Sequence, residues 1–140
     1  MLNQQLIFVP CLILIITTFL VLITMFSRRI KYIKSGKIKP SHFKTHDTDQ
    51  KESAKTVQAQ RNFANLQEAP PIFYILCLIT YVTGNVNELM IGLSWAFLIF
   101  RLVHTLIHIT SNKLPARMFS FALSWLVVIV MSAILIIKVI

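Results

Sequence analysis

Charged side chains are scarce in this sequence, and their scarcity excludes an ordinary soluble domain. Only 14% of the 140 residues are charged, whereas 56% are hydrophobic. A soluble domain usually carries about 25% charged residues. Glycine is also rare, with 3 residues, and the sequence shows no low-complexity tract or internal repeat. These shortages predict one membrane domain that covers residues 1–140.

Cysteine is scarce as well, and the positions of the two cysteines exclude a disulfide framework. Cys11 and Cys77 both lie inside apolar runs. Cysteine in such a run usually behaves as a small buried hydrophobic side chain. We therefore expect two buried thiols that have no structural cross-link between them.

Positive charge is present, but it is unevenly distributed along the chain. Of the 14 Lys and Arg residues, 10 lie between Arg28 and Arg61, directly after an uncharged run. A basic segment beside a membrane span meets anionic headgroups and marks the cytosolic side. No groove-reading motif accompanies this charge, so nucleic acid is not an expected partner.

Four apolar runs predict four membrane-spanning helices. About 20 helical residues cross the roughly 30 Å of hydrocarbon in a bilayer, because each residue adds about 1.5 Å. Basic residues follow the first run instead of preceding it, which favours a retained helix over a signal peptide. The fold class is therefore all-α, an integral membrane four-helix bundle. The expected spans are about residues 6–27, 69–87, 89–109 and 119–137.

The second helix should begin well before its apolar run. Helix-forming residues fill the approach from about Ser53 onward. Pro70 and Pro71 then fall inside the helix, where they are expected to kink it. Gly84 and Asn85 predict a short turn before the third span.

The connections between the spans predict the orientation in the membrane. The first connection holds nearly all of the basic charge, and the third holds Lys113 and Arg117. The second connection has only Glu88. By the positive-inside rule, the first and third connections should face the cytosol, and both termini should lie outside.

Two of the expected helices carry polar and ionisable side chains that a lipid environment disfavours. Each helix holds three of them, spaced so that they share one helical face. Both sets lie toward the cytosolic ends of their helices, so antiparallel neighbours would bring them to the same depth. The sets are Arg61, Asn65 and Glu68 at the second span, and Arg101, His104 and His108 in the third.

Three interpretations of these polar faces remain open. The first is a structural salt bridge of Glu68 with Arg61 or Arg101. The second is an anion site, because one carboxylate cannot neutralise Arg61, Arg101 and Arg117 together, whereas a ligand with carboxylates would help to do so. The third is a metal held by the two histidines, which the adjacent Arg101 and the shortage of further ligands oppose. The anion site is favoured, and no metal is expected.

At these residues the sequence resembles the MAPEG family, the membrane-associated proteins in eicosanoid and glutathione metabolism. The pattern R-x-x-x-N-x-x-E-x-x-P over residues 61–71 matches the second-helix signature of that family. The polar pattern over residues 101–117, R-x-x-H-T followed by P-x-R, resembles the microsomal prostaglandin E synthase branch in residue type and spacing. The apolar spans also fit the family, so the resemblance covers nearly the whole chain.

The resemblance implies a homotrimer of four-helix bundles, with glutathione bound between neighbouring subunits near the cytosolic face. Arg117 matches the arginine thought to stabilise the glutathione thiolate, and it would be the catalytic residue. A cation beside a thiol lowers the thiol pKa from about 8.5 and so produces the nucleophilic thiolate. A hydrophobic small molecule or lipid from the bilayer would be the second substrate. The implied glutathione contacts are Arg29, Arg61, Asn65, Glu68, Arg101, His104 and His108.

Three departures from that branch limit the expected activity. His108 stands where its members often have tyrosine, Met118 stands where they have serine, and Phe121 replaces a tyrosine. Specialised eicosanoid chemistry is therefore unsupported, whereas a glutathione transferase or peroxidase acting on lipophilic electrophiles is the expected function. The alternative is a non-catalytic lipid-binding or activating protein, as in one branch of the family. Transport is disfavoured because no inverted repeat or pair of broken helices is present.

Overall fold

The structure is a computed structural model that describes residues 3–45 and 51–140, so part of the basic first connection, residues 46–50, lies outside it. In these ranges all regular elements are helical, which confirms the all-α prediction. Four of the helices are long. They are α1 (Val9–Lys34), α3 (Ala54–Val82), α4 (Glu88–Ile109) and α5 (Leu114–Val139), and the short elements are the 3-10 helix η1 (Gln4–Phe8) and α2 (His42–Thr45).

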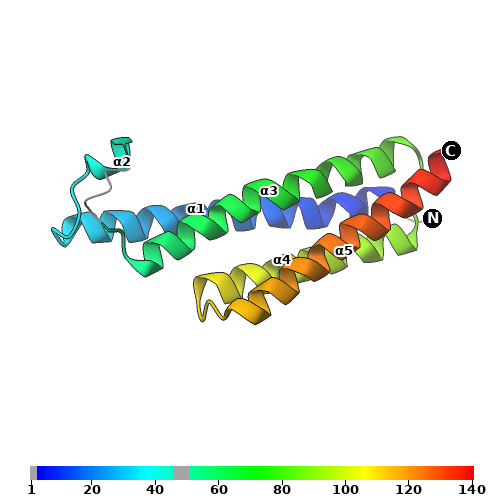
Figure 1. The fold of residues 1–140 in the computed structure, drawn as a ribbon. Coiled ribbons are helices and arrows are strands. Elements are labelled where there is room, and N and C mark those ends of the chain that lie inside the picture. The colour runs from blue at the N-terminus through cyan, green and yellow to red at the C-terminus, as the bar shows by residue number, and fades with distance from the viewer. Residues whose placement is uncertain (1–2, 46–50) are drawn as a thin grey trace.

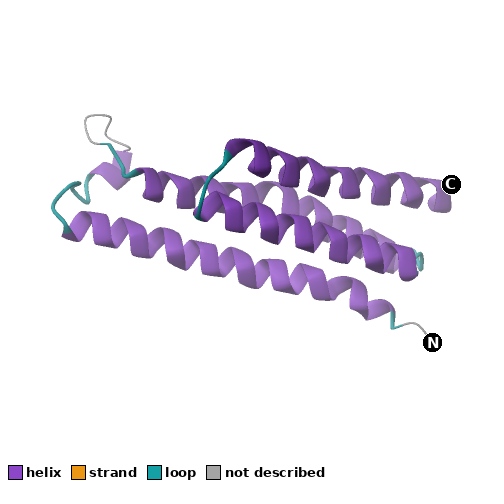
Figure 2. Ribbon diagram, turned by 90° about the horizontal axis from the view of Figure 1, so that it is seen from below, coloured by secondary structure: helices purple, strands orange, loops and turns teal. Residues whose placement is uncertain are grey.

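The long helices form two antiparallel pairs. Helix α1 lies along α3, and α4 lies along α5 (Figure 1). The α4–α5 connection, residues 110–113, and the described parts of the α1–α3 connection, residues 35–45 and 51–53, lie toward one end of the bundle, which we call the loop end. The start of η1, the end of α5 and the α3–α4 connection lie at the opposite end, which we call the terminal end (Figure 2).

Three of the four long helices are long and apolar enough to cross a membrane. These segments are Gln4–Lys34, which joins η1 to α1, together with Glu88–Ile109 and Leu114–Val139. Helix α3 is long enough but does not share their composition, because its first half carries Lys55, Arg61 and Glu68. The chain is thus an integral membrane protein in which one helix is apolar over only part of its length.

The boundaries of α3 follow from its capping residues. The Ser53 side chain accepts a hydrogen bond from the Thr56 amide at 3.1 Å, which confirms the expected start. The helix continues through Pro70 and Pro71 and ends at Val82. Residues 83–87 of the expected second span therefore lie in the connection, where Gly84 has the positive φ of 68° that glycine tolerates.

The core gathers buried side chains from all four long helices, and an aromatic pair joins α3 to α4 within it. The rings of Phe73 and Phe97 stack with centroids 4.1 Å apart, and both side chains are fully buried. Cys11 and Cys77 are free, buried thiols in the same core, as expected from the sequence. Many outward side chains are large and apolar, which suits contact with lipid or with other membrane helices.

Replacing Phe73 should test this packing. Phe73→Ala removes the stacked ring and leaves a cavity against α4. In soluble cores such a change costs about 3–5 kcal/mol. We expect a smaller loss of about 2 kcal/mol here, because lipid solvates an exposed ring almost as well as the core does. Denaturant unfolding in detergent micelles measures the loss.

Phe19→Ala is the matched control, because Phe19 on α1 is 59% exposed. It should change the unfolding free energy by less than Phe73→Ala does. Equal losses in the two variants would contradict the assignment of the core.

Candidate functional site

The polar face of α4 is buried near the loop end of the bundle. Arg101 is 0% exposed, His104 3% and His108 2%. They follow one another at i, i+3 and i+7, so one side of the helix carries all three. Buried ionisable groups are costly in a membrane bundle and mark functional sites by default.

Arg101 joins α4 to α3. One terminal nitrogen of its guanidinium donates to the Asn65 backbone oxygen at 2.7 Å. The guanidinium carbon also lies 5.6 Å from the centre of the Phe121 ring, on α5. Its Nε and other terminal nitrogen have no hydrogen-bond partner in the structure. The charge is therefore held in place by three helices but is only partly satisfied.

His104 joins α4 to the first turns of α5. Its Nδ1 lies 3.0 Å from the Arg117 backbone oxygen. Its ring centre lies 5.7 Å from that of Phe121. The Ser120 hydroxyl, buried beside them, donates to the same Arg117 oxygen at 3.0 Å. The backbone at residue 117 is consequently fixed against α4.

The Arg117 side chain is held by the connection between α4 and α5. One of its terminal nitrogens donates to the Asn112 side-chain oxygen at 2.7 Å. Asn112 adopts a positive φ of 49°, a conformation that asparagine tolerates better than most residues. The tight turn thus carries the acceptor that orients the arginine.

Arg117 lies between two neighbouring pockets. The first, which we call the Phe121 pocket, has a volume of about 350 Å³ and is walled mainly by α5. The second, which we call the Arg61 pocket, has a volume of about 240 Å³ and lies between the start of α3 and the α4–α5 connection. Asn65 and His104 line the first, whereas Arg61 and His108 line the second. Arg117 is the one residue that lines both of these pockets.

The structure places the expected α3 residues differently from those of α4. Asn65 is partly buried, whereas Arg61 and Glu68 are exposed in the single chain. In the described ranges Glu68 has no cationic side chain within ion-pair distance, so the salt bridge that was one of the three open interpretations is not formed there. Arg29 lines neither pocket, and its guanidinium lies 4.9 Å from the centre of the Phe43 ring.

Several site residues were not among those expected from the sequence. Asn112 orients Arg117, and Met118, Phe121 and Ala122 supply the apolar wall of the Phe121 pocket. Phe121 lies four residues after Arg117, on the same helical face, and this spacing is a signal that could have found it. The role of Asn112 has no such signal, because it depends on how the turn folds.

The two histidines of α4 lie close to each other. Their ring centres are 5.6 Å apart. In the described part of the chain, no group of three or more His, Cys, Asp or Glu side chains could hold a metal ion. The polar groups identified at the site are guanidinium, imidazole, hydroxyl and amide groups.

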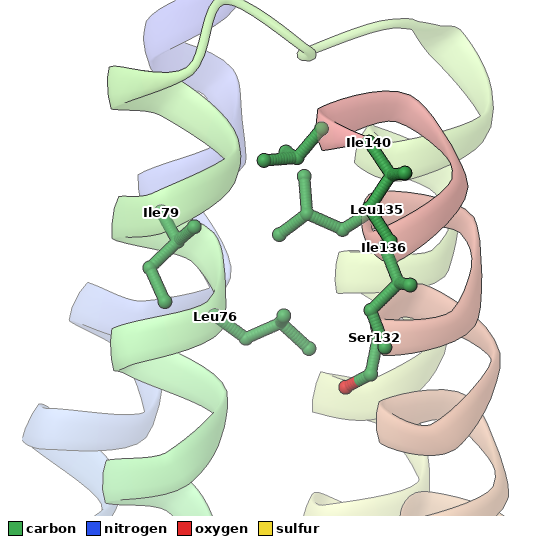
Figure 3. Close-up of a pocket in the computed structure, with 7 residues that line it drawn as sticks. Leu76, Ile79, Ser132, Leu135, Ile136 and Ile140 are labelled. Carbon is green, nitrogen blue, oxygen red and sulfur yellow. The ribbon is translucent and has the colours of Figure 1, made fainter.

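A groove of different character lies at the terminal end. Leu76 and Ile79 on α3 face Ser132, Leu135 and Ile136 on α5 across it (Figure 3). Its volume is about 330 Å³, and its wall is almost entirely hydrocarbon. No residue of the two polar faces contributes to it.

These observations define first a class of protein. Three helices of membrane length are apolar, and α4 carries buried Arg101, His104 and His108 toward the loop end, so the chain is a helical integral membrane protein with a buried cationic face. The chain belongs to the MAPEG family, because the model of that family matches residues 7–137. This membrane-protein family includes glutathione transferases and peroxidases. Comparison with curated proteins finds no match.

The partly satisfied guanidinium of Arg101 gives a prediction about stability. Arg101→Met keeps much of the side-chain volume and removes a buried charge that has few partners. Replacing a whole buried ion pair by apolar side chains is often neutral or stabilising by about 1–4 kcal/mol, and a buried charge without a counter-charge is costlier still. We therefore expect the ligand-free variant to unfold at a higher temperature than the wild type in detergent.

Arg61→Met, at an exposed position of α3, serves as the control and should shift the midpoint little. A lower midpoint for Arg101→Met would show that other groups neutralise Arg101 in the assembled protein.

Proposed function

We propose that the protein is a membrane-embedded glutathione transferase or peroxidase that acts on lipophilic electrophiles. The observation that carries this proposal is the position of Arg117 between a cationic pocket and an apolar one. A neighbouring cation stabilises a thiolate. An apolar surface binds the lipophilic electrophile that the thiolate attacks. Membership of the MAPEG family supports the same chemistry.

The Arg61 pocket suits the charged part of glutathione. The tripeptide carries two carboxylates and one amine, so it is an anion at neutral pH. Arg61 lines this pocket and would hold a carboxylate through charge-assisted hydrogen bonds, while Arg117, at its edge, would face the thiol. Glu68 lies two turns further along α3 and would accept the amine, while Asn65 and Arg101 would contact the peptide from α3 and α4. His104 and His108 complete the proposed contacts.

The Phe121 pocket suits the reacting groups. Arg117 would lower the thiol pKa and stabilise the thiolate. The thiolate sulfur then attacks an electrophilic carbon, a carbon–sulfur bond forms, and the leaving group departs with its bonding electrons. Met118, Phe121 and Ala122 would accept the electrophile as it enters sideways from the bilayer.

We also propose a homotrimer, since the single chain leaves the α3 part of the site open. Arg61 and Glu68 are exposed at a helix surface that must face either lipid or protein. Lipid disfavours both residues, and a neighbouring subunit would cover them. Arg29, which is apart from the pockets of its own chain, would then contact glutathione held by the neighbour.

The proposed orientation places the loop end in the cytosol. Arg28, Arg29 and Arg117 lie toward this end, as does most of the basic charge. The positive-inside rule then leaves both termini outside. Helix α3 would be the fourth crossing, because it runs alongside α1 from one end of the bundle to the other (Figure 1).

A second candidate function is non-catalytic lipid binding. The apolar groove between α3 and α5 favours it, because this groove could hold an acyl chain far from Arg117 (Figure 3). The residue spacing is nearest to the prostaglandin E synthase branch, but the replacements at His108, Met118 and Phe121 argue against that branch's own reaction. The transferase remains the main proposal.

The transferase is tested by the conjugation of glutathione to 1-chloro-2,4-dinitrobenzene in detergent. Arg117→Ala should lower kcat by about a hundredfold or more, because it removes the group that stabilises the thiolate. Thermal stabilisation by glutathione should persist in the variant, since most of the proposed contacts remain.

Lys113→Ala provides the matched control. It removes an exposed cation from the same connection, and Lys113 lines neither pocket. Equal kcat in wild type and Arg117→Ala would contradict the catalytic role. Absence of turnover and of glutathione stabilisation in the wild type would favour the lipid-binding alternative.

Glu68→Gln separates a ligand contact from a structural partner. Glu68 forms no ion pair within the described ranges, so the variant should fold and assemble much as the wild type does. It should bind glutathione about tenfold more weakly, because a neutral amide replaces the charged acceptor of the amine. Calorimetric titration and sizing of the detergent-solubilised protein measure the two effects. Loss of assembly with unchanged glutathione affinity would reverse the assignment.

A further inference from the structure

A third polar pocket lies at the loop end, where α1 ends and α3 begins. Its volume is about 310 Å³. Four cationic side chains line it, and no acidic residue stands among the described residues of its wall. The cations are Arg28, Lys31, Lys37 and Lys55. Such a concentration of like charge in one concavity is costly unless an anion occupies it.

Arg28 fixes the shape of this pocket. One terminal nitrogen of its guanidinium donates to the Lys55 backbone oxygen at 2.7 Å, and the other donates to the Ile109 backbone oxygen at 3.2 Å. These bonds tie the end of α1 to the start of α3 and the end of α4. Contacts between three helices thus fix the backbone around the pocket. The lysine side chains line the same pocket.

The α3 side of the pocket supplies hydroxyl groups. Ser53 and Thr56 line it, and their oxygens lie 2.8 Å apart. Ser53 is the N-cap of α3 and Thr56 lies in its first turn, where the amide groups at a helix start also favour an anion. Hydroxyl and ammonium groups together are typical of phosphate binding.

The acidic side chain that precedes the pocket in sequence does not line it. Glu52 comes directly before Ser53, but its carboxylate lies 3.8 Å from the His42 imidazole. Among the described residues of the wall, the cationic side chains therefore have no carboxylate beside them.

The pocket lies at the depth expected of lipid headgroups. Phe26 and Ile30 on α1 are each 50% exposed, so an apolar surface reaches this level of the helix. Arg28 and Lys31 lie beside them in the sequence and line the pocket together with residues of α3. A helix that passes from apolar to basic over one turn crosses the membrane surface there.

We propose that this pocket binds the phosphate-bearing headgroup of an anionic membrane lipid at the loop end of the bundle. A phosphomonoester carries a charge of about −1.5 to −2 and three acceptor oxygens, which matches several ammonium groups and two hydroxyls. A choline headgroup brings its own cation and is a poorer match. The site is separate from the pockets of Arg117, so it does not rest on the proposed enzyme activity.

The test uses the full chain in detergent, titrated with short-chain phosphatidic acid. Lys31→Gln with Lys55→Gln removes two pocket cations at exposed helix positions. Each lysine near a membrane surface contributes enough binding free energy that the double variant should raise the Kd at least about tenfold.

Lys34→Gln with Lys51→Gln is the matched control. It removes two exposed lysines from the same end of the bundle, and neither of them lines the pocket. Its Kd should stay within about twofold of the wild type.

Further variants and ligands test the need for positive charge, the folding of the variants and the identity of the ligand. Lys31→Arg with Lys55→Arg preserves the charge and should restore most of the affinity. Equal unfolding midpoints would show that the glutamine variants still fold. If both double glutamine variants bind phosphatidic acid equally weakly, the ligand is held by diffuse surface charge and the assignment to this pocket is wrong.

Glycerol 3-phosphate carries the same phosphomonoester without acyl chains. If it binds as tightly as phosphatidic acid, the proposal that the ligand is a lipid is wrong. Phosphatidylserine, with one net charge, should bind more weakly than phosphatidic acid.

Discussion

The contact between the His104 imidazole and the Arg117 backbone oxygen is the interaction on which the geometry of the site depends. It fixes the start of α5 to the polar face of α4, while the Arg101 guanidinium fixes that face to the Asn65 backbone of α3. Because these bonds join three helices at one level, Arg117 cannot move far without disturbing the bundle. Asn112 then directs its side chain to the place where two pockets meet.

An excess of cations over anions is the second constraint. Arg101 is fully buried and has two nitrogens without a partner, and the nearby Glu68 forms no ion pair in the described ranges. A soluble domain would surround such groups with water, but the bilayer offers none. Occupation by an anion, or coverage by a second chain, would therefore stabilise the protein. The cost of buried charge would in this way link the proposed function to the proposed assembly.

The pockets at the two ends of the bundle differ in chemical character. All three polar pockets with arginine in their walls gather at the loop end, whereas the groove between α3 and α5 at the terminal end is apolar. Arg28 separates the basic pocket at the membrane surface from the site of Arg117, because it spans from α3 to α4. A lipid headgroup in the basic pocket and a thiol beside Arg117 would thus contact different cationic side chains at the loop end.

The amino-acid sequence alone predicts the helical class, the start of α3 near Ser53 and the shared face of Arg101, His104 and His108. Apolar runs, capping residues and helical spacing are local properties, so they can be recognised in a sequence. The sequence also indicates an excess of cations around Glu68. The folded structure is needed to see that Glu68 lacks an ion pair among the described residues, that Asn112 holds Arg117, that Arg29 faces Phe43, and that Arg28 shapes a separate pocket. These relations join residues from different helices or depend on the path of a turn, so no local pattern fixes them.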